Sequence, residues 1–189
     1  ISTSRTMAKR YQCLSRHTET VEKYVLQIFY TMRRYHGMGQ RERLLLQIAV
    51  LIHACGKFIS VRNSNECAYN IIMSTEIIWI SHLEREIIAN VVRYNIRDFD
   101  YNKVRMETEL DAVTDSFGGQ NEVMLLIAKL TAILRLANSM DRGPGDKLAD
   151  CKMAVKDGKL MITTDYPGDI TLEAVSFEQK AAFFEEIFG

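Results

Sequence analysis

The stretch LLLQIAVLIHACGKFIS, residues 44–60, decides the fold of this chain. Its first nine residues are apolar nearly all round, and such a helix belongs at the centre of a bundle rather than on its surface. Gly56 follows a few residues later, where the stop of a helix is expected. We therefore predict a central helix over residues 44–52, with other helices packed around it.

Other segments on either side of this centre carry helix signals. Ser81 stands three residues before Glu84, a capping box that begins one helix. Residues 121–141 form the longest predicted helix, and about 20 residues at helical rise reach roughly 30 Å, the width of a small domain. A short helix is predicted over about 65–74. A loop is predicted over 95–103, where polar and aromatic residues follow no helical or strand spacing.

An earlier helix is marked by apolar residues at alternating steps of four and three, which define one helical face. Gly37 and Gly39 are expected to end it. The residues of this face are Val21, Val25, Ile28, Met32 and Tyr35.

The pattern changes after residue 148. Asp157–Gly158 lies between two alternating segments, which is a strong hairpin signal because both turn positions need positive φ. A third strand is expected over 170–175, and Ser176 with Gln179 is expected to cap a final helix. The sequence thus predicts a mainly α chain: a helical domain over 1–148, then a small β-meander and a closing helix over 149–189.

Composition narrows the class of function. The 189 residues are 47% hydrophobic and 25% charged. The formal net charge is zero, so the chain has no overall positive charge that would favour the binding of DNA. No apolar stretch reaches the roughly 18 residues of a membrane span. Cys55 lies inside an apolar run and none of the four cysteines forms a CxxC pair, which favours buried reduced thiols in a cytoplasmic protein.

Several segments together resemble one family. Residues 44–60 are similar to the His–Asp segment of HD-type proteins. RHTETVEKYVLQIF (16–29), the stretch 68–95 ending in RYN, KLTAILRLANSMDRG (129–143) and LEAVSFEQKAAFFEEIFG (172–189) resemble, in order, the C-terminal region of the Ppx/GppA exopolyphosphatase and guanosine pentaphosphate phosphohydrolase family. The helical domain is therefore expected to be an HD-like bundle.

The resemblance implies a larger protein. In that family an actin-like N-terminal half carries the active site and uses Mg²⁺ to cleave terminal phosphate from polyphosphate or pppGpp. The HD-like half is implicated in dimer contacts and in holding anionic substrate. We expect this chain to be the accessory half of such an enzyme, with the N-terminal half as a partner, a homodimer as the assembly and no cofactor of its own. Polyphosphate and guanosine polyphosphates are its candidate ligands.

The HD pattern is incomplete here. The resemblance places His17 and His53 at the two histidine positions, but Ala54 stands where the aspartate is expected, Asn138 replaces the late aspartate, and Asn95 replaces the RYH histidine. Two neutral imidazoles without an anionic partner make a poor site for a hard metal. We therefore predict a vestigial pocket made of His17, His53, Ala54, Glu66 and Asn138, with no metal and no catalytic residue.

Two uses of the pocket stay open, and so does an alternative. The polar residues hydrogen-bond one another, or they bind a small anion or nucleotide without cleaving it. The alternative is a divergent metal-dependent HD phosphohydrolase acting on nucleotides, in which Glu66 shares a metal with the two histidines. Trp79 is expected to pack under the bundle or to be covered by another chain.

Basic residues near these segments are candidate anion contacts, because guanidinium groups match phosphate oxygens well. The competing interpretation is pairing with carboxylates or plain exposure to solvent, and Asp141 at the end of the long helix is explained either by a local salt bridge or by a positioning role. Arg41 and Arg43 belong to a denser basic turn near 33–43. The candidate contacts are Arg33, Arg34, Lys57, Arg62, Arg93, Arg135 and Arg142.

Overall fold

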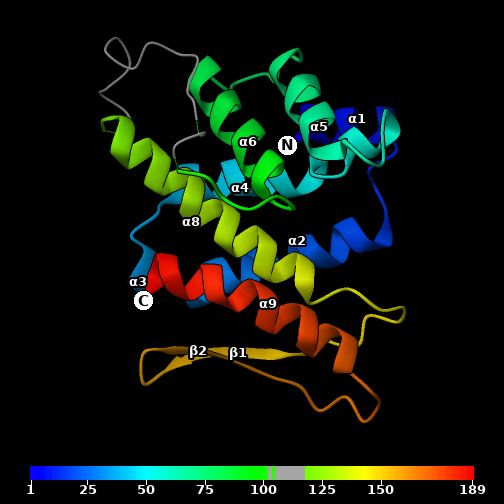
Figure 1. Ribbon diagram of the computed structural model, residues 1–189, viewed down its shortest axis with the longest axis vertical. Helices are drawn as coiled ribbons and strands as arrows, with labels where there is room; N and C mark the ends of the chain where they lie inside the picture. The colour runs from blue at the N-terminus through cyan, green and yellow to red at the C-terminus, as the bar shows by residue number, and fades with distance from the viewer. Residues whose placement is uncertain (102–103, 105–117) are drawn as a thin grey trace.

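A computed structural model describes residues 1–101, 104 and 118–189 of the chain. The fold class is confirmed: the described chain is mainly helical, with a two-stranded sheet and a closing helix (Figure 1). In chain order the helices and strands are α1 (Ser2–Arg10), α2 (Arg16–Thr31), α3 (Arg33–His36), α4 (Gln40–Ile52), η1 (Cys55–Phe58, a 3₁₀ turn), α5 (Ser64–Met73), α6 (His82–Tyr94), α8 (Gln120–Ser139), β1 (Lys152–Lys156), β2 (Lys159–Thr163) and α9 (Thr171–Phe188).

The predicted central helix is α4, and it is buried almost all round. It packs against α1, α2, α6 and α8, and every residue from 45 to 52 except Gln47 is buried. Burial of this apolar surface is the main stabilising term of the bundle. The helices predicted over 65–74 and 121–141 correspond to α5 and α8, and the capping box of Ser81 and Glu84 begins α6 as predicted.

Gly56 has a different role from the one expected. The helix α4 already ends at Ile52, and Gly56 lies inside η1. A Cβ atom at this position would lie 1.7 Å from the carbonyl oxygen of Ser64. Glycine is therefore needed here for the close approach of η1 to α5, and this contact positions Lys57 and the end of α4.

The helix predicted to end at Gly37 is divided in two. The break lies at Met32, between α2 and α3, and Gly37 then ends α3 in the left-handed region with φ 68°. The predicted loop over 95–103 follows α6: residues 95–101 form no helix or strand, whereas 102 and 103 lie outside the described residues.

The predicted hairpin is confirmed, but the prediction of a third strand over 170–175 is wrong. The strands β1 and β2 pair antiparallel, and Asp157 and Gly158 form the turn with φ 51° and 73°. Residues 171–175 belong instead to α9, which packs along α8 (Figure 1). Packing between two helices outweighs the β propensity of isoleucine, threonine and valine here.

The start of α9 also differs from the expected cap at Ser176, which lies buried inside the helix. The Oδ1 atom of Asp169 accepts from the backbone N–H of Thr171 at 2.8 Å. Glu173, 2% exposed, accepts from the N–H of Gly143 and from Lys147. This buried carboxylate ties the loop after α8 to α9. The predicted domain boundary at residue 148 stays a prediction.

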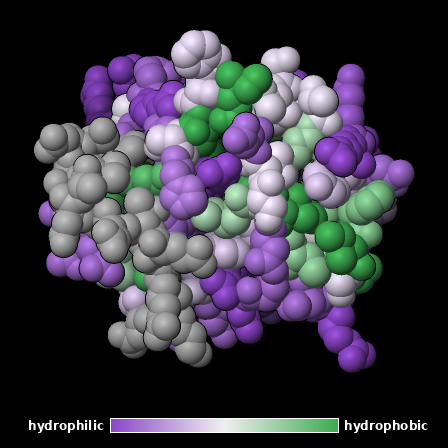
Figure 2. All heavy atoms as spheres, turned by 90° about the horizontal axis from the view of Figure 1, so that it is seen from above, coloured by the Kyte–Doolittle hydropathy of each residue, from purple (hydrophilic) through white to green (hydrophobic). Residues whose placement is uncertain are grey.

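The chain exposes apolar side chains at several points, and Figure 2 shows that, on the face seen from above, apolar groups form separate patches among polar ones. Trp79 is 88% exposed with φ 67°, so the expectation that it packs under the bundle is wrong. None of the described helices is long and apolar enough to cross a bilayer. Cys55 is a buried free thiol, as predicted.

Candidate functional site

His17 is held by two hydrogen bonds that link α2 to the end of α8. The side chain of Ser15 accepts from the N–H of Thr18 and begins α2, which places His17 in the first turn. Its Nδ1 lies 2.6 Å from the Oδ2 of Asp141, and its Nε2 lies 2.9 Å from the Oδ1 of Asn138. Both ring nitrogens of His17 are therefore engaged by side chains from the end of α8. Asp141 thus pairs with a residue 124 positions away.

His53, at the end of α4, is neutral. Burial lowers its pKa to about 4, and the charges of His17 and Lys57 act in the same direction. Its Nδ1 lies 2.6 Å from the carbonyl oxygen of Val50, so that nitrogen donates and Nε2 carries the lone pair. The rings of His53 and His17 meet edge to face with centroids 5.8 Å apart. The pair predicted from the sequence is therefore brought together.

Glu66 lies away from the histidines. Its carboxylate binds the guanidinium groups of Arg93 at 2.8 Å and Arg97 at 2.6 Å. Ala54, beside His53, has no side-chain donor or acceptor. Within the described ranges, no group of three or more histidine, cysteine, aspartate or glutamate residues is arranged to hold a metal ion.

A cavity of about 150 Å³ opens between the histidines and α9. His17, His53 and Asn138 line it, as the sequence predicts, together with four basic residues: Lys57, Arg135, Arg142 and Lys180. No carboxylate from the described part of the chain is among the lining residues. The result is a small polar cavity with a strong excess of positive charge.

The basic residues of the cavity divide by what they bind. Arg135 donates from Nε to the carbonyl oxygen of Tyr94 at 2.7 Å and from a terminal nitrogen to that of Arg97, and its guanidinium lies 4.6 Å from the ring centroid of Phe183. Arg135 therefore fastens the end of α6 to α8. Burial lowers its pKa without neutralising it in the physiological range.

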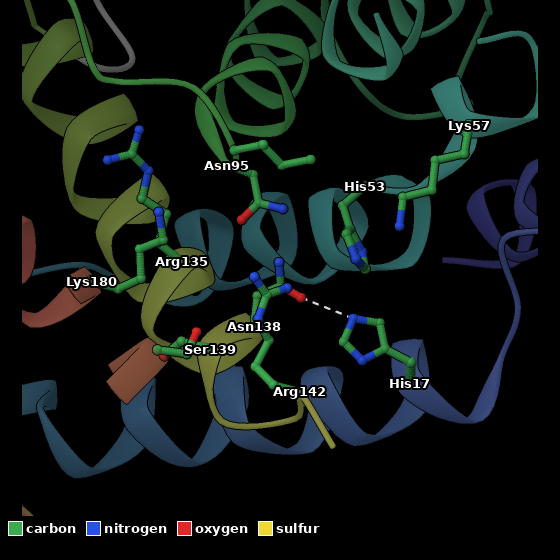
Figure 3. A pocket seen from close by; sticks show the side chains of 11 residues that line it. His17, His53, Lys57, Asn95, Arg135, Asn138, Ser139, Arg142 and Lys180 are labelled. Atoms are coloured by element: carbon green, nitrogen blue, oxygen red, sulfur yellow. Dashed lines mark hydrogen bonds between the residues drawn. The ribbon is translucent and has the colours of Figure 1, made fainter. Parts of the chain in front are cut away.

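Lys57, Arg142 and Lys180 form no ion pair with any carboxylate in the described residues. Figure 3 shows the guanidinium of Arg142 beside Asn138 at the centre of the cavity, and Lys57 reaching toward His53. Burial, with the charges of Arg135 and Arg142, lowers the pKa of Lys180. Like charges gathered in this way without a counterion favour the binding of an anion.

Asn95 completes the cavity from the end of α6. Its side chain is directed toward Asn138 and Arg142 (Figure 3), and the residue is 3% exposed. Neither its Oδ1 nor its Nδ2 has a hydrogen-bond partner in the described structure. Sequence reasoning noted Asn95 only as a replaced histidine, and it missed Ile96, Ser139, Ser176 and Lys180. The spacing of Ser176 and Lys180, one helical turn apart, would have found those two if the segment had been taken as helix from residue 171.

An open groove of about 380 Å³ adjoins the cavity and shares His17 and Arg142 with it. Arg16, Asp141, Gly143 and Pro144 form the rest of its lining. Arg16 in this groove is paired with the carboxylate of Asp146 at 2.7 Å, so its charge is compensated.

The remaining predicted anion contacts lie elsewhere. Arg33 and Arg34 are exposed on α3, and Arg62 is exposed after η1. Arg41 is neutralised, because its Nε and a terminal nitrogen donate to the two oxygens of Glu84 at 2.5 and 2.6 Å. Arg93 is neutralised by Glu66. The structure thus brings Lys57, Arg135 and Arg142 to the pocket and leaves the others outside it.

Comparison with known proteins gives one family. The family described as Ppx/GppA phosphatase, domain III, matches residues 1–180. No curated protein matches the chain.

Proposed function

Since the chain belongs to the Ppx/GppA phosphatase family as its domain III, we propose that it is an accessory domain that binds phosphate-bearing anions and does not hydrolyse them. One observation carries this proposal: the cavity has Lys57, Arg135, Arg142 and Lys180 in its lining and no described carboxylate. Arginine and lysine are the usual ligands of phosphate groups.

The donor atoms at the HD-type positions do not fit a hydrolytic metal ion. Both nitrogens of His17 are used by Asp141 and Asn138, and Nδ1 of His53 is used by the backbone of Val50. Ala54 contributes no oxygen. A divalent metal that activates water needs anionic oxygen or several free imidazoles. This chemistry supports a binding role and gives the alternative of a metal-dependent hydrolase no support.

The proposal extends to partners. The catalytic centre, with its Mg²⁺, belongs on an actin-like half of the same cytoplasmic protein, and this domain docks against that half and against a second copy. Trp79 supports a docking role: its backbone carbonyl oxygen accepts a hydrogen bond from Arg41 at 2.7 Å, and its side chain is exposed beside the exposed Ile78. Rigid exposed aromatic groups are frequent anchors of interfaces.

Isothermal titration of the chain with sodium tripolyphosphate, beside metal analysis by mass spectrometry, tests the binding role. We expect saturable heat with one site per chain, strong weakening when Arg142 is changed to Gln, and no weakening when Arg97, which pairs with Glu66 outside the cavity, is changed to Gln. The absence of heat would refute anion binding. Stoichiometric manganese, iron or nickel that is lost with His53→Ala would favour the hydrolase instead.

A further inference from the structure

Two buried thiols meet where the segment after α1 packs against η1. The thiol of Cys55 donates a hydrogen bond to the sulfur of Cys13, and the thiol of Cys13 lies 3.5 Å from the carbonyl oxygen of Tyr11, to which it donates. Cys13 is 3% exposed and Cys55 is fully buried. The two cysteines are far apart in the sequence, so the fold alone brings their sulfur atoms together.

The backbone on each side of this contact is held in place. The carbonyl oxygen of Cys13 accepts from the hydroxyl of Thr18 at 2.7 Å, and its N–H donates to the carbonyl oxygen of Ala8 at 2.8 Å. The rings of Tyr11 and Phe58 meet edge to face with centroids 5.8 Å apart, which joins the same segment to the end of η1. The thiol contact is therefore part of a packed junction between two elements.

The surroundings give the two sulfur atoms different reactivity. The hydrogen bond from Cys55 lowers the pKa of Cys13, burial opposes this, and the positive charge of Lys57 lowers it further. The pKa of Cys55 is raised by the same hydrogen bond and by burial. Because the thiolate is the nucleophile, Cys13 is the sulfur that attacks an oxidant. Its access is through the end of α1, which packs mainly on α4 and can open locally more easily than the core.

We propose that Cys13 and Cys55 form a reversible disulfide when the chain meets a peroxide, and that this bridge fastens the end of α1 to η1. The thiolate of Cys13 attacks one oxygen of hydrogen peroxide, becomes a sulfenic acid and releases hydroxide. The sulfur of Cys55 then attacks the sulfur of Cys13, and the sulfenic hydroxyl leaves with the proton of Cys55 as water. The two sulfur atoms together lose the two electrons that reduce the peroxide. Exchange with a small thiol, which is itself oxidised to a disulfide, restores both cysteines.

The bridge would lie beside two walls of the cavity. Lys57 belongs to η1 together with Cys55, and the segment after Cys13 leads to Ser15, which begins α2, and to His17. Fastening α1 to η1 therefore restricts two segments that supply cavity residues. The inference concerns the thiols alone and stands independently of the proposed anion binding.

Peroxide treatment of the reduced chain, followed by denaturation and alkylation of the remaining thiols, tests the pairing. Mass spectrometry should show the loss of two hydrogen atoms, alkylation of only two of the four cysteines, and peptides linked through Cys13 and Cys55. Dithiothreitol should reverse all three changes. The melting temperature of the oxidised chain should be higher by about 5–10 °C, because the bridge restricts the unfolded state.

Cys13→Ser and Cys55→Ser should each abolish both the linked peptides and the rise in melting temperature. Cys67→Ser and Cys151→Ser are the matched controls and should keep both; Cys67 is the stricter control, because it lies close enough to Cys55 to affect its pKa. Alanine variants serve where a serine variant does not fold, as checked by circular dichroism. A link between Cys55 and Cys67 would overturn the assigned pair. Four free thiols after peroxide treatment, or a sulfenic acid that never resolves, would overturn the bridge itself.

Discussion

Basic side chains of this chain stand in two contrasting surroundings. On the outer side of α6, Arg93 and Arg97 share the carboxylate of Glu66, and Arg41 forms two hydrogen bonds with Glu84. In the cavity between α2, α8 and α9, Lys57, Arg142 and Lys180 meet histidine, asparagine and serine, with no described carboxylate in the lining. Both groups are basic, but only the second group has no carboxylate partner among the described residues.

The difference matters because an ion pair already satisfies the donors of an arginine. An incoming phosphate would have to displace Glu66 or Glu84 before it could bind there, and it would also meet their negative charge. In the cavity the binding of an anion relieves repulsion between like charges and pairs donors that are otherwise unpaired. Anion binding is therefore expected in the cavity and not at the paired arginines.

The largest effect is expected from reversing one charge in each group. Arg142→Glu removes a donor and adds repulsion, so tripolyphosphate binding should fall more than about 100-fold, given the strength of hydrogen bonds between charged groups. Arg97→Glu places the same charge change beside Glu66 and should alter the affinity less than about threefold. Titration calorimetry at constant ionic strength measures both. Equal losses would mean that the overall charge, not the cavity, governs binding.

The pH dependence of stability should reveal how strongly the cavity opposes a further charge. The folded-state pKa of His53 is lowered to about 4 by burial and by His17 and Lys57, against about 6.5 in the unfolded chain. Between these two pH values the unfolded state binds more protons than the folded state. The contribution of His53 to the free energy of unfolding is therefore fully present above pH 6.5, and up to about 3 kcal/mol of it is lost as the pH falls toward 4.

Urea unfolding of the wild type and of His53→Gln at several pH values isolates this contribution, because His36, whose pKa is also lowered by burial, is present in both. The variant should show a flatter profile between pH 6.5 and 4. Parallel profiles would mean that the pKa of His53 in the folded chain equals its value in the unfolded chain.

A smaller effect is expected at the paired Arg41. Glu84 is 5% exposed, and although burial alone would raise its pKa, the hydrogen bonds from Arg41 and from the N–H of Ser81 outweigh this and hold the pKa below the usual value. Glu84→Gln should lower the unfolding free energy at pH 7 by about 1–2 kcal/mol, because it weakens both the ion pair and the cap of α6.

Because the pKa of Glu84 is lowered in the folded chain, the stabilisation is fully present above the unfolded pKa of about 4.3 and is lost as pH falls through the lower folded value. Glu42→Gln is the matched control: Glu42 caps α4 through the N–H of Gly39 but has no arginine partner in the described residues. An equal loss in the control would assign the effect to capping alone.

The smallest effect should come from Glu66→Gln, which leaves Arg93 and Arg97 without their carboxylate. Because Arg97 is more than half exposed, we expect a loss below about 1 kcal/mol in unfolding free energy and little new binding of tripolyphosphate. Thermal denaturation and titration measure the two quantities. A new site as strong as the cavity would show that pairing alone, and not enclosure, distinguishes the two groups.

Features that depend on neighbours along the chain could be predicted from the residues alone. An apolar run that surrounds a helix made α4 central, a capping box began α6, and Asp157–Gly158 formed the hairpin turn. Aligned segments also identified the family and showed that Ala54 supplies no oxygen. Each of these features depends on the spacing of apolar residues, on turn geometry or on the identity of single residues, and all three can be recognised within a short segment of the sequence.

The pairing of polar groups, in contrast, depends on the folded arrangement of distant segments. Asp141 binds His17 across 124 positions, Arg41 binds Glu84 across 43, and Glu66 binds Arg93 across 27, and no local pattern predicts these partners. Packing against α8 also made 171–175 helical and carried Lys180 into the cavity, while Asn95 was left buried without a partner. Charge and burial act through space, so the electrostatic character of a site is settled by which distant segments the fold brings together.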